Sequence, residues 1–183
     1  MFVINLHHMR RLVTLLSLCG LLLWPGAAFA DSFSITMYSI SGEGIGESIG
    51  TIEAQDTSDG LLIRPSLQGL REGEHGFHLH AGESCENARN GDGVAVAGLA
   101  ALGHWDPDNT NTHQGPFGDG HRGDLSRLIV DADGLTRTNV VAPRLNAADL
   151  HGRALIVHAG GDTYTDTPSL GGGGARIACG VAS

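Results

Sequence analysis

Apolar and polar side chains alternate along short segments of this chain. Phe33, Ile35 and Met37 are separated by single polar residues, and a period of two places successive side chains on opposite faces of a strand. Gly, Asp, Asn and Pro separate such segments, and no long amphipathic helical period is present. The pattern predicts an all-β domain, an antiparallel sandwich or barrel with long functional loops. Further candidate strands lie at 48–54, 61–65, 75–80, 125–131, 138–142, 153–158 and 175–181.

The N-terminal segment has the composition of a secretory signal peptide. An arginine pair precedes the apolar run 12–24, and a small-x-small cleavage motif ends at Ala30. The apolar run is too short to span a bilayer. We therefore expect a signal peptide at 1–30, export to the periplasm and one mature domain at 31–183. Met9 is an alternative start of translation.

The predicted cleavage divides the three cysteines. Cys19 leaves with the signal peptide, and lipid anchoring there is disfavoured because Leu18 precedes it where a lipoprotein signal has a small residue. Cys85 and Cys179 remain, in a compartment where disulfides persist. A bridge between them would stabilise the fold by about 4 to 5 kcal/mol in the chain-entropy model. Two free buried thiols are the alternative.

The charge of the mature domain limits its partners. All 20 acidic residues lie in it, but only 9 of the 11 basic ones, so that its net charge is −11. Every basic residue is arginine, and the chain has no lysine. This balance argues against a nucleic acid and against a membrane as the partner of the mature protein.

The segment 103–124 concentrates candidate metal ligands in a stretch that cannot form a long helix or strand. It contains glycines, prolines and asparagines together with His104, His113, His121 and Asp124. With little apolar surface to bury, such a loop needs another source of free energy to offset its chain entropy. Nitrogen and carboxylate ligands of this kind suit tetrahedral Zn²⁺. The alternative is a set of solvated loop residues.

A second group of histidines lies on a predicted strand. The period of two puts Phe77 and Leu79 on one face and His78 and His80 on the other. Two imidazoles on one side of a strand suit a metal that favours nitrogen, Cu²⁺ above all. His75 shares the face of Phe77, so we interpret it as a packed, hydrogen-bonded histidine rather than a ligand.

His158 follows an apolar strand, at the point where a loop begins. Together with His78, His80 and one histidine of the 103–124 loop it would complete four nitrogens around copper. That count requires one histidine to serve two metals through both ring nitrogens.

Six motifs of the mature chain together resemble the copper,zinc superoxide dismutases, and specifically their periplasmic bacterial branch. The motifs are GEHGFHLH at 73–80, GHWDPDNTNTHQGP at 103–116, GHRGDL at 120–125, APRL at 142–145, IVHAGGD at 156–162 and LGGGGARIACGV at 170–181.

This resemblance implies an eight-stranded antiparallel Greek-key β-barrel with long metal-binding and electrostatic loops. It also implies one copper and one zinc per chain, with His104 bridging the two. The implied copper ligands are His78, His80, His104 and His158, and the implied zinc ligands are His104, His113, His121 and Asp124.

The resemblance further assigns roles around the metals. Asp162 would hydrogen-bond one ligand of each metal, here His78 and His113, and Arg176 would guide the anion to copper. Superoxide would be converted to O₂ and H₂O₂ by cycling Cu²⁺ and Cu⁺, with the His104 bridge supplying a proton. Cys85 and Cys179 would form the intrasubunit disulfide.

Other interpretations of the same residues stay open at this point. His113, His121 and Asp124 would also fit a non-haem iron site, and a copper store on the same fold is a non-enzymatic alternative. Arg176 could instead pair with an acidic residue of the 159–175 loop. The resemblance allows a monomer or a homodimer, and the aromatic Phe117 slightly favours the dimer.

Overall fold

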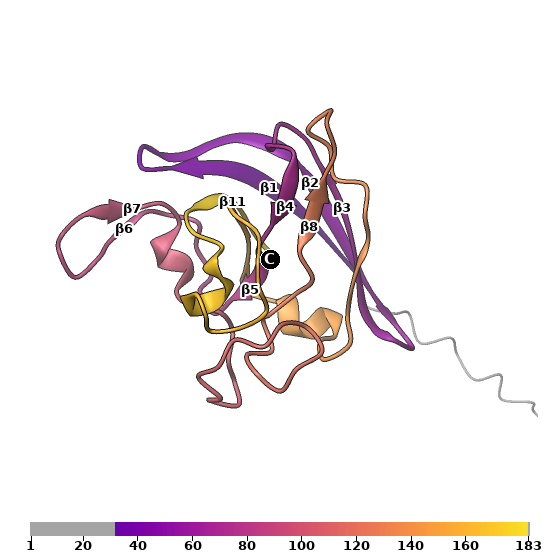
Figure 1. Cartoon of the computed structure of the whole chain (residues 1–183). Coiled ribbons are helices and arrows are strands. Elements are labelled where there is room, and N and C mark those ends of the chain that lie inside the picture. Colours follow the sequence, from indigo (N-terminus) through magenta and orange to yellow (C-terminus); the bar gives the residue numbers. More distant parts are fainter. Residues whose placement is uncertain (1–31, 183) are drawn as a thin grey trace, which may run out of the picture.

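The computed structural model describes residues 32–182, which form strands joined by long loops (Figure 1). Seven strands make one antiparallel sheet in the order β5-β10-β11-β1-β2-β3-β9, and β4-β8 and β6-β7 form two-stranded sheets. The strands are β1 (Ser32–Ser41), β2 (Gly44–Thr57), β3 (Gly60–Leu67), β4 (Gly73–His75), β5 (Phe77–His80), β6 (Ala88–Arg89), β7 (Ala95–Val96), β8 (Leu128–Val130), β9 (Val140–Ala142), β10 (Ala154–His158) and β11 (Arg176–Val181).

Helical structure within residues 32–182 is limited to three short 3-10 turns. None of them is long and apolar enough to cross a membrane. They are η1 (Leu99–Ala101), η2 (Ala147–Leu150) and η3 (Ser169–Gly172).

The alternating side chains of the first three strands face a common core. Ile35 of β1 lies opposite Ile52 of β2, and Ala54 of β2 lies opposite Ile63 of β3. All four are buried, while the residues between them are more exposed. Burying a full-sized aliphatic side chain contributes about 1.5 to 3 kcal/mol. The predicted all-β pattern therefore arises from burial of one face of each strand.

The strand expected at 75–80 is interrupted at Gly76. β4 pairs with β8, whereas β5 pairs with β10. At the interruption the Gly76 amide donates to the Gly160 carbonyl, and the His158 amide donates to the Gly76 carbonyl. The chain thus changes partner strands at this residue, and the loop after β10 is held against it.

The connection from β3 to β4 gives the fold its topology. These strands are consecutive in the chain but not neighbours in a sheet, so that their connection crosses over to a non-adjacent strand, as in a Greek key. If β4 and β5 are counted as one interrupted strand, eight strands surround the core, and β6-β7 is a separate hairpin that projects from it (Figure 1). The predicted eight-stranded Greek-key barrel is confirmed.

Several predicted strand limits are wrong. The segment expected at 48–54 belongs to a β2 of 14 residues, because its hairpin partners continue past both ends. The segment expected at 125–131 forms a strand only at β8. β8 ends before Asp131, because the Asp131 carboxylate accepts a hydrogen bond from the Leu135 amide and so closes a turn.

Cys85 and Cys179 form the predicted disulfide, and the alternative of two free thiols is wrong. Both cysteines are buried in a small apolar cluster with Ile156 of β10. The bridge therefore ties the long segment after β5 to the last strand. Cys19 and the predicted cleavage site at Ala30 lie outside the described residues.

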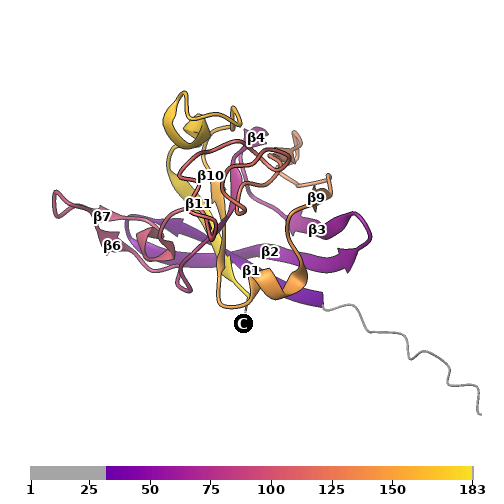
Figure 2. The same ribbon diagram turned by 90° about the horizontal axis from the view of Figure 1, so that it is seen from below.

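Two long loops surround one part of the sheet. The later part of the segment between β5 and β8, residues 103–127, and the segment between β10 and β11 lie on the same side of the β1-β2-β3 hairpins (Figure 2). The first of these loops carries all of the candidate metal ligands that the strands do not supply, and the second carries Asp162.

Candidate metal centre

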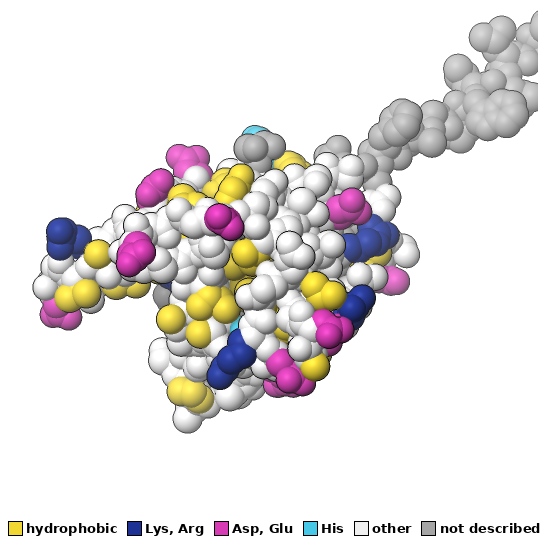
Figure 3. All heavy atoms as spheres, turned by 90° about the horizontal axis from the view of Figure 1, so that it is seen from above, with side chains coloured by type: hydrophobic (Ala, Val, Ile, Leu, Met, Phe, Trp, Pro, Cys, Tyr) yellow, Lys and Arg dark blue, Asp and Glu magenta, His cyan; other side chains and the backbone are white. Residues whose placement is uncertain are grey.

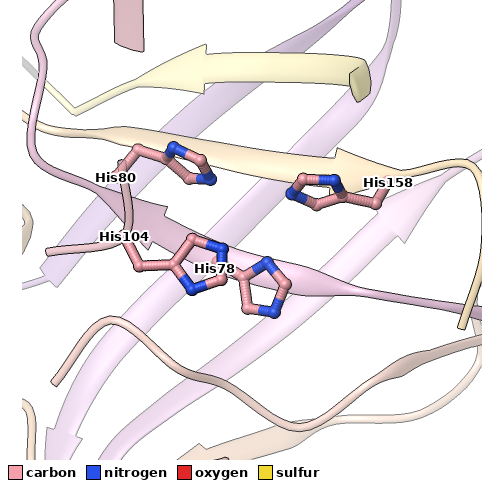
Figure 4. Close-up of side chains that lie close together, drawn as sticks. All are labelled: His78, His80, His104 and His158. Carbon is pink, nitrogen blue, oxygen red and sulfur yellow. The ribbon is translucent and has the colours of Figure 1, made fainter. Parts of the chain in front are cut away.

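β5 and β10 place three histidines side by side. His78 and His80 project from β5 away from the core residues Phe77 and Leu79, as the alternation predicted, and all four are buried. His158 ends the neighbouring strand β10. These rings gather with that of His104, which comes from the loop after β5 (Figure 4). One ligand atom from each of the four histidines lies within 4.8 Å of the others.

Hydrogen bonds fix which ring nitrogen of each histidine faces the cluster. His80 Nδ1 lies 2.8 Å from the Leu102 carbonyl oxygen and His158 Nδ1 lies 3.0 Å from that of Gly174. His78 uses its other nitrogen, Nε2, which lies 2.7 Å from Asp162 Oδ2.

The opposite ring nitrogens have no hydrogen-bond partner. His78 Nδ1, His80 Nε2 and His158 Nε2 are all buried and unpaired within the described residues. Buried polar atoms are rarely left unsatisfied, since each costs about 1 to 3 kcal/mol. Three such atoms at one point fit a cation that accepts their lone pairs.

Electrostatics keep these rings available as ligands. Burial lowers the pKa of His78 to about 3 and that of His158 to about 4, and it also lowers the pKa of His80 well below its usual value. A metal binds the neutral imidazole rather than the imidazolium. At neutral pH the three rings therefore do not need to lose a proton before they bind a metal.

A second cluster converges on a single carboxylate oxygen. Asp124 Oδ1 lies 2.9 Å from the Nδ1 atoms of His104 and His113 and 3.2 Å from that of His121. All four residues are buried. Burial opposes ionisation of Asp124, but the adjacent imidazoles of His104 and His113 outweigh it and hold its pKa well below the usual range. Three nitrogens and one carboxylate form a donor set typical of tetrahedral Zn²⁺.

His104 belongs to both clusters. Its Nδ1 is directed to Asp124, which leaves Nε2 for the cluster on β5 and β10. The His104 ring also stacks on that of His78, with 3.9 Å between the ring centroids. The ligand count required one histidine to serve two metals, and His104 lies where it can do so.

Asp162 contacts one histidine of each cluster. Its Oδ2 is 2.7 Å from His78 Nε2 and its Oδ1 is 2.8 Å from His113 Nε2. Gly171 makes room for this carboxylate, because a Cβ at that position would lie 2.1 Å from Asp162 Oδ1. Carboxylates in this position orient imidazole ligands and raise their basicity.

Arg176 stands at a cavity of about 270 Å³ beside the first cluster. The guanidinium donates to the carbonyl oxygens of Gly98 and Leu102, the latter at 2.6 Å, and burial lowers its pKa. Among the described residues it makes no ion pair, so the alternative of pairing with an acidic residue of the 159–175 loop is wrong. Its charge therefore remains available to an anion that enters the cavity.

Leu102 is a functional residue that the sequence did not indicate. Its carbonyl oxygen contacts both His80 Nδ1 and the Arg176 guanidinium, and its φ of +65° is unusual for a residue other than glycine. The role belongs to the backbone, so no side-chain signal could have predicted it. The exposed Leu170 lines the same cavity.

His75 is packed and hydrogen-bonded, as predicted. Its Nδ1 lies 2.6 Å from the His158 carbonyl oxygen and its Nε2 lies 2.7 Å from that of Arg71. The ring is 1% exposed. Since both ring nitrogens are occupied, His75 supports the backbone of His158 and is not one of the clustered ligands.

The fold and the two clusters together define an all-β protein built to hold two adjacent metal ions. Little histidine surface is visible on the face in Figure 3, in agreement with the burial of these ligands. A single histidine shared between the clusters distinguishes this arrangement from two independent sites.

Comparison with known proteins agrees with this class. The sequence model of the family described as copper/zinc superoxide dismutase (SODC) matches residues 48–182. "Superoxide dismutase [Cu-Zn] 2" of Salmonella typhimurium is 48% identical over 172 residues, 93% of this chain and 95% of that protein. The chain belongs to the copper/zinc superoxide dismutase family.

Solved structures show the same relationship. The Cu/Zn superoxide dismutase from Brucella abortus is similar with a TM-score of 0.81 and 46% identity, over 84% of this chain and all of that one. The monomeric copper, zinc superoxide dismutase from Salmonella enterica has a TM-score of 0.74 and 48% identity, again over 84% of this chain and all of that one.

Proposed function

We propose that this protein is a periplasmic enzyme that removes superoxide, converting two superoxide anions and two protons into O₂ and H₂O₂. The observation that carries the proposal is the set of three unpaired, buried ring nitrogens beside a cavity with an arginine in its wall. Copper would be held by His78, His80, His104 and His158, and zinc by His104, His113, His121 and Asp124.

The chemistry divides between the metal and the chain. Copper, when bound, supplies one-electron redox chemistry, which lets one superoxide be oxidised and the next be reduced. Arg176 attracts the anion into the cavity, and its two carbonyl contacts hold the guanidinium there. His104 can hold a proton at Nε2 while Asp124 fixes its Nδ1 side, which places a proton donor next to where the reduced product forms.

The two other functions that the sequence allows account for fewer of these residues. A non-haem iron site at His113, His121 and Asp124 leaves the three unpaired nitrogens on β5 and β10 without a role. A copper store needs neither an open cavity nor Arg176 in its wall. Superoxide dismutation uses all of these features.

Export and assembly complete the proposal. The leader at 1–30, with cleavage after Ala30, would deliver the domain 31–183 to the periplasm, where its disulfide can persist. The homodimer stays a prediction. Phe117 in the 103–124 loop is 78% exposed, which leaves an aromatic side chain available for an interface. The similar Salmonella enterica protein, by contrast, is monomeric.

Metal analysis combined with one substitution tests the proposal. We expect the mature chain to take up one copper and one zinc and then to remove superoxide in the presence of a chelator that masks free copper, whereas the metal-free chain should not. In His104→Ala the copper absorption spectrum should change, because a ligand shared with zinc is lost. The exposed His151 provides the control, since His151→Ala leaves both clusters intact. Uptake of two zincs and no copper, or an unchanged copper spectrum in His104→Ala, would contradict the proposal.

A further inference from the structure

The loop that supplies the zinc cluster has almost no hydrophobic anchor of its own. Between His113 and His121 the one large apolar side chain, Phe117, is 78% exposed. Four of its residues are nevertheless buried, namely Gly115, Pro116, Gly120 and His121. Buried carbonyl groups need hydrogen-bond donors, so this loop depends on a partner outside itself.

Arg144 supplies those donors. Its guanidinium contacts four carbonyl oxygens of this one loop segment. In the described part of the chain the carbonyls of Gly115, Pro116 and Gly120 accept from no other donor. The distances to the guanidinium nitrogens are 3.2 Å from Gly115, 3.3 Å from Pro116, 2.8 Å from Gly120 and 2.6 Å from His121.

The backbone that carries Arg144 is itself well fixed. Arg144 follows Pro143, which restricts φ, and lies between the buried side chains of Ala142 at the end of β9 and Leu145. The Leu145 amide donates to the Ala142 carbonyl and closes the turn. The guanidinium therefore projects from the barrel wall at a defined position, independently of the loop that it binds.

We propose that Arg144 is the positioning residue of the zinc site, holding the segment 115–121 in its binding conformation before the metal arrives. This inference rests on the proposed assignment of zinc to His113 and His121. The contact with the His121 carbonyl acts on a ligand directly, and the other three fix the turn that leads to it. The planar fork of an arginine can reach four carbonyls at once, which an ammonium group cannot do.

Zinc binding by copper-free protein tests the proposal. Arg144→Met keeps an unbranched apolar side chain but removes every donor, and we expect it to raise the zinc dissociation constant, measured by chelator competition, about 10- to 100-fold, the range for residues that orient ligands. Arg144→Lys should recover only part of the loss. The absorption spectrum of Co²⁺ bound in place of zinc should change, while copper affinity at the β5 and β10 histidines stays within about threefold.

The matched control is Arg122→Met. Arg122 lies in the same loop next to His121, but its side chain binds only the exposed Asp108. Loss of zinc affinity in Arg122→Met equal to that in Arg144→Met would overturn the proposal. So would wild-type zinc affinity in Arg144→Met, or equal weakening of copper and zinc, which is the result of a general loss of stability.

Hydrogen exchange of the wild-type protein provides a second measurement that no folding defect can obscure. In the metal-free state the hydrogen-bonded amides of His113, Gln114 and His121 should be protected, because Arg144 holds the loop without zinc. Exchange of these amides as fast as in an unfolded chain would overturn the proposal. A wild-type protein that binds no zinc at all would instead refute the proposed function, so the two failures are distinguishable.

Discussion

Arg176 of β11 lies directly opposite His158 of β10, at a bulge where the register of the two strands shifts. This pairing brings a guanidinium and a candidate copper ligand into the wall of one cavity. The same arginine contacts the Leu102 carbonyl that also holds His80. Arg176 is therefore linked to one candidate ligand by strand pairing and to another through a shared carbonyl group.

Substitution of Arg176 should slow superoxide removal without loss of metal. One guanidinium at about 5 Å attracts an anion by roughly 3 kcal/mol at an effective dielectric constant of 20, and fields of this kind raise association rates by about 10- to 1,000-fold. We expect Arg176→Ala to be about tenfold slower and Arg176→Glu slower still. The dependence of the rate on salt should flatten or invert, as measured by stopped-flow kinetics.

Arg137→Ala is the control for net charge. Arg137 pairs with Asp131 on the surface and is 62% exposed, so Arg137→Ala changes the total charge as much as Arg176→Ala does but leaves the charge at the cavity unaltered. If Arg176→Glu kept both metals, the wild-type rate and the wild-type response to salt, Arg176 would have no guiding role.

Asp162→Asn should weaken both metals. The carboxylate accepts from His78 in one cluster and from His113 in the other, and an amide cannot accept through both of its polar atoms. We expect dissociation constants for copper and zinc about 10- to 100-fold higher, measured by chelator competition. Asp108→Asn, which alters an exposed carboxylate paired with Arg122, should leave both unchanged. An effect confined to a single metal would argue against the bridging role.

Loss of the disulfide should lower both stability and activity. Cys85 and Cys179 are 94 residues apart in sequence, and closing a loop of that size stabilises a fold by about 4 to 5 kcal/mol in the chain-entropy model. The bridge also anchors the segment whose carbonyls at Gly98 and Leu102 hold Arg176. We therefore expect Cys85→Ser to reduce the melting temperature and the rate of superoxide removal. A lower melting temperature with full activity would show that the bridge has no positioning effect.

The metal-free protein should become less stable in acid. The folded state excludes protons from His78 and His158, whose pKa values burial lowers to about 3 and about 4, whereas the unfolded chain binds them near pH 6.5. The free energy of unfolding should therefore fall as the pH decreases from 6.5 towards 4. Imidazole NMR signals that report titration of His78 or His158 near pH 6.5 in the folded state would contradict this.

His113 should have the opposite effect on the pH dependence of stability in the metal-free protein. Burial disfavours its charged form, but the adjacent carboxylates of Asp124 and Asp162 outweigh burial and raise its pKa to about 9. Its contribution to stability is complete below pH 6.5 and is lost as the pH rises through 9. Unfolding curves of His113→Gln across this range should lack that alkaline loss.

Much of the site could be predicted from the sequence because its ligands lie in local patterns. The alternation at Phe77, His78, Leu79 and His80 determines by itself which side chains face the apolar core and which face the metal cluster. His104, His113, His121 and Asp124 fall within one glycine-rich segment, so the short chain between them already limits how far apart they can lie. The predicted eight-stranded Greek-key topology, by contrast, came from the resemblance, because strand order depends on pairings distant in the chain.

The tertiary structure alone decided the contacts made by backbone groups and by strand pairing. The carbonyls of Leu102 and Gly174 select the ring nitrogens of His80 and His158, and Arg144 holds a loop more than twenty residues away through four carbonyls. Every residue carries the same carbonyl group, so the sequence has no signal that marks which ones will be used. Only the folded arrangement of strands and turns brings each donor to its acceptor.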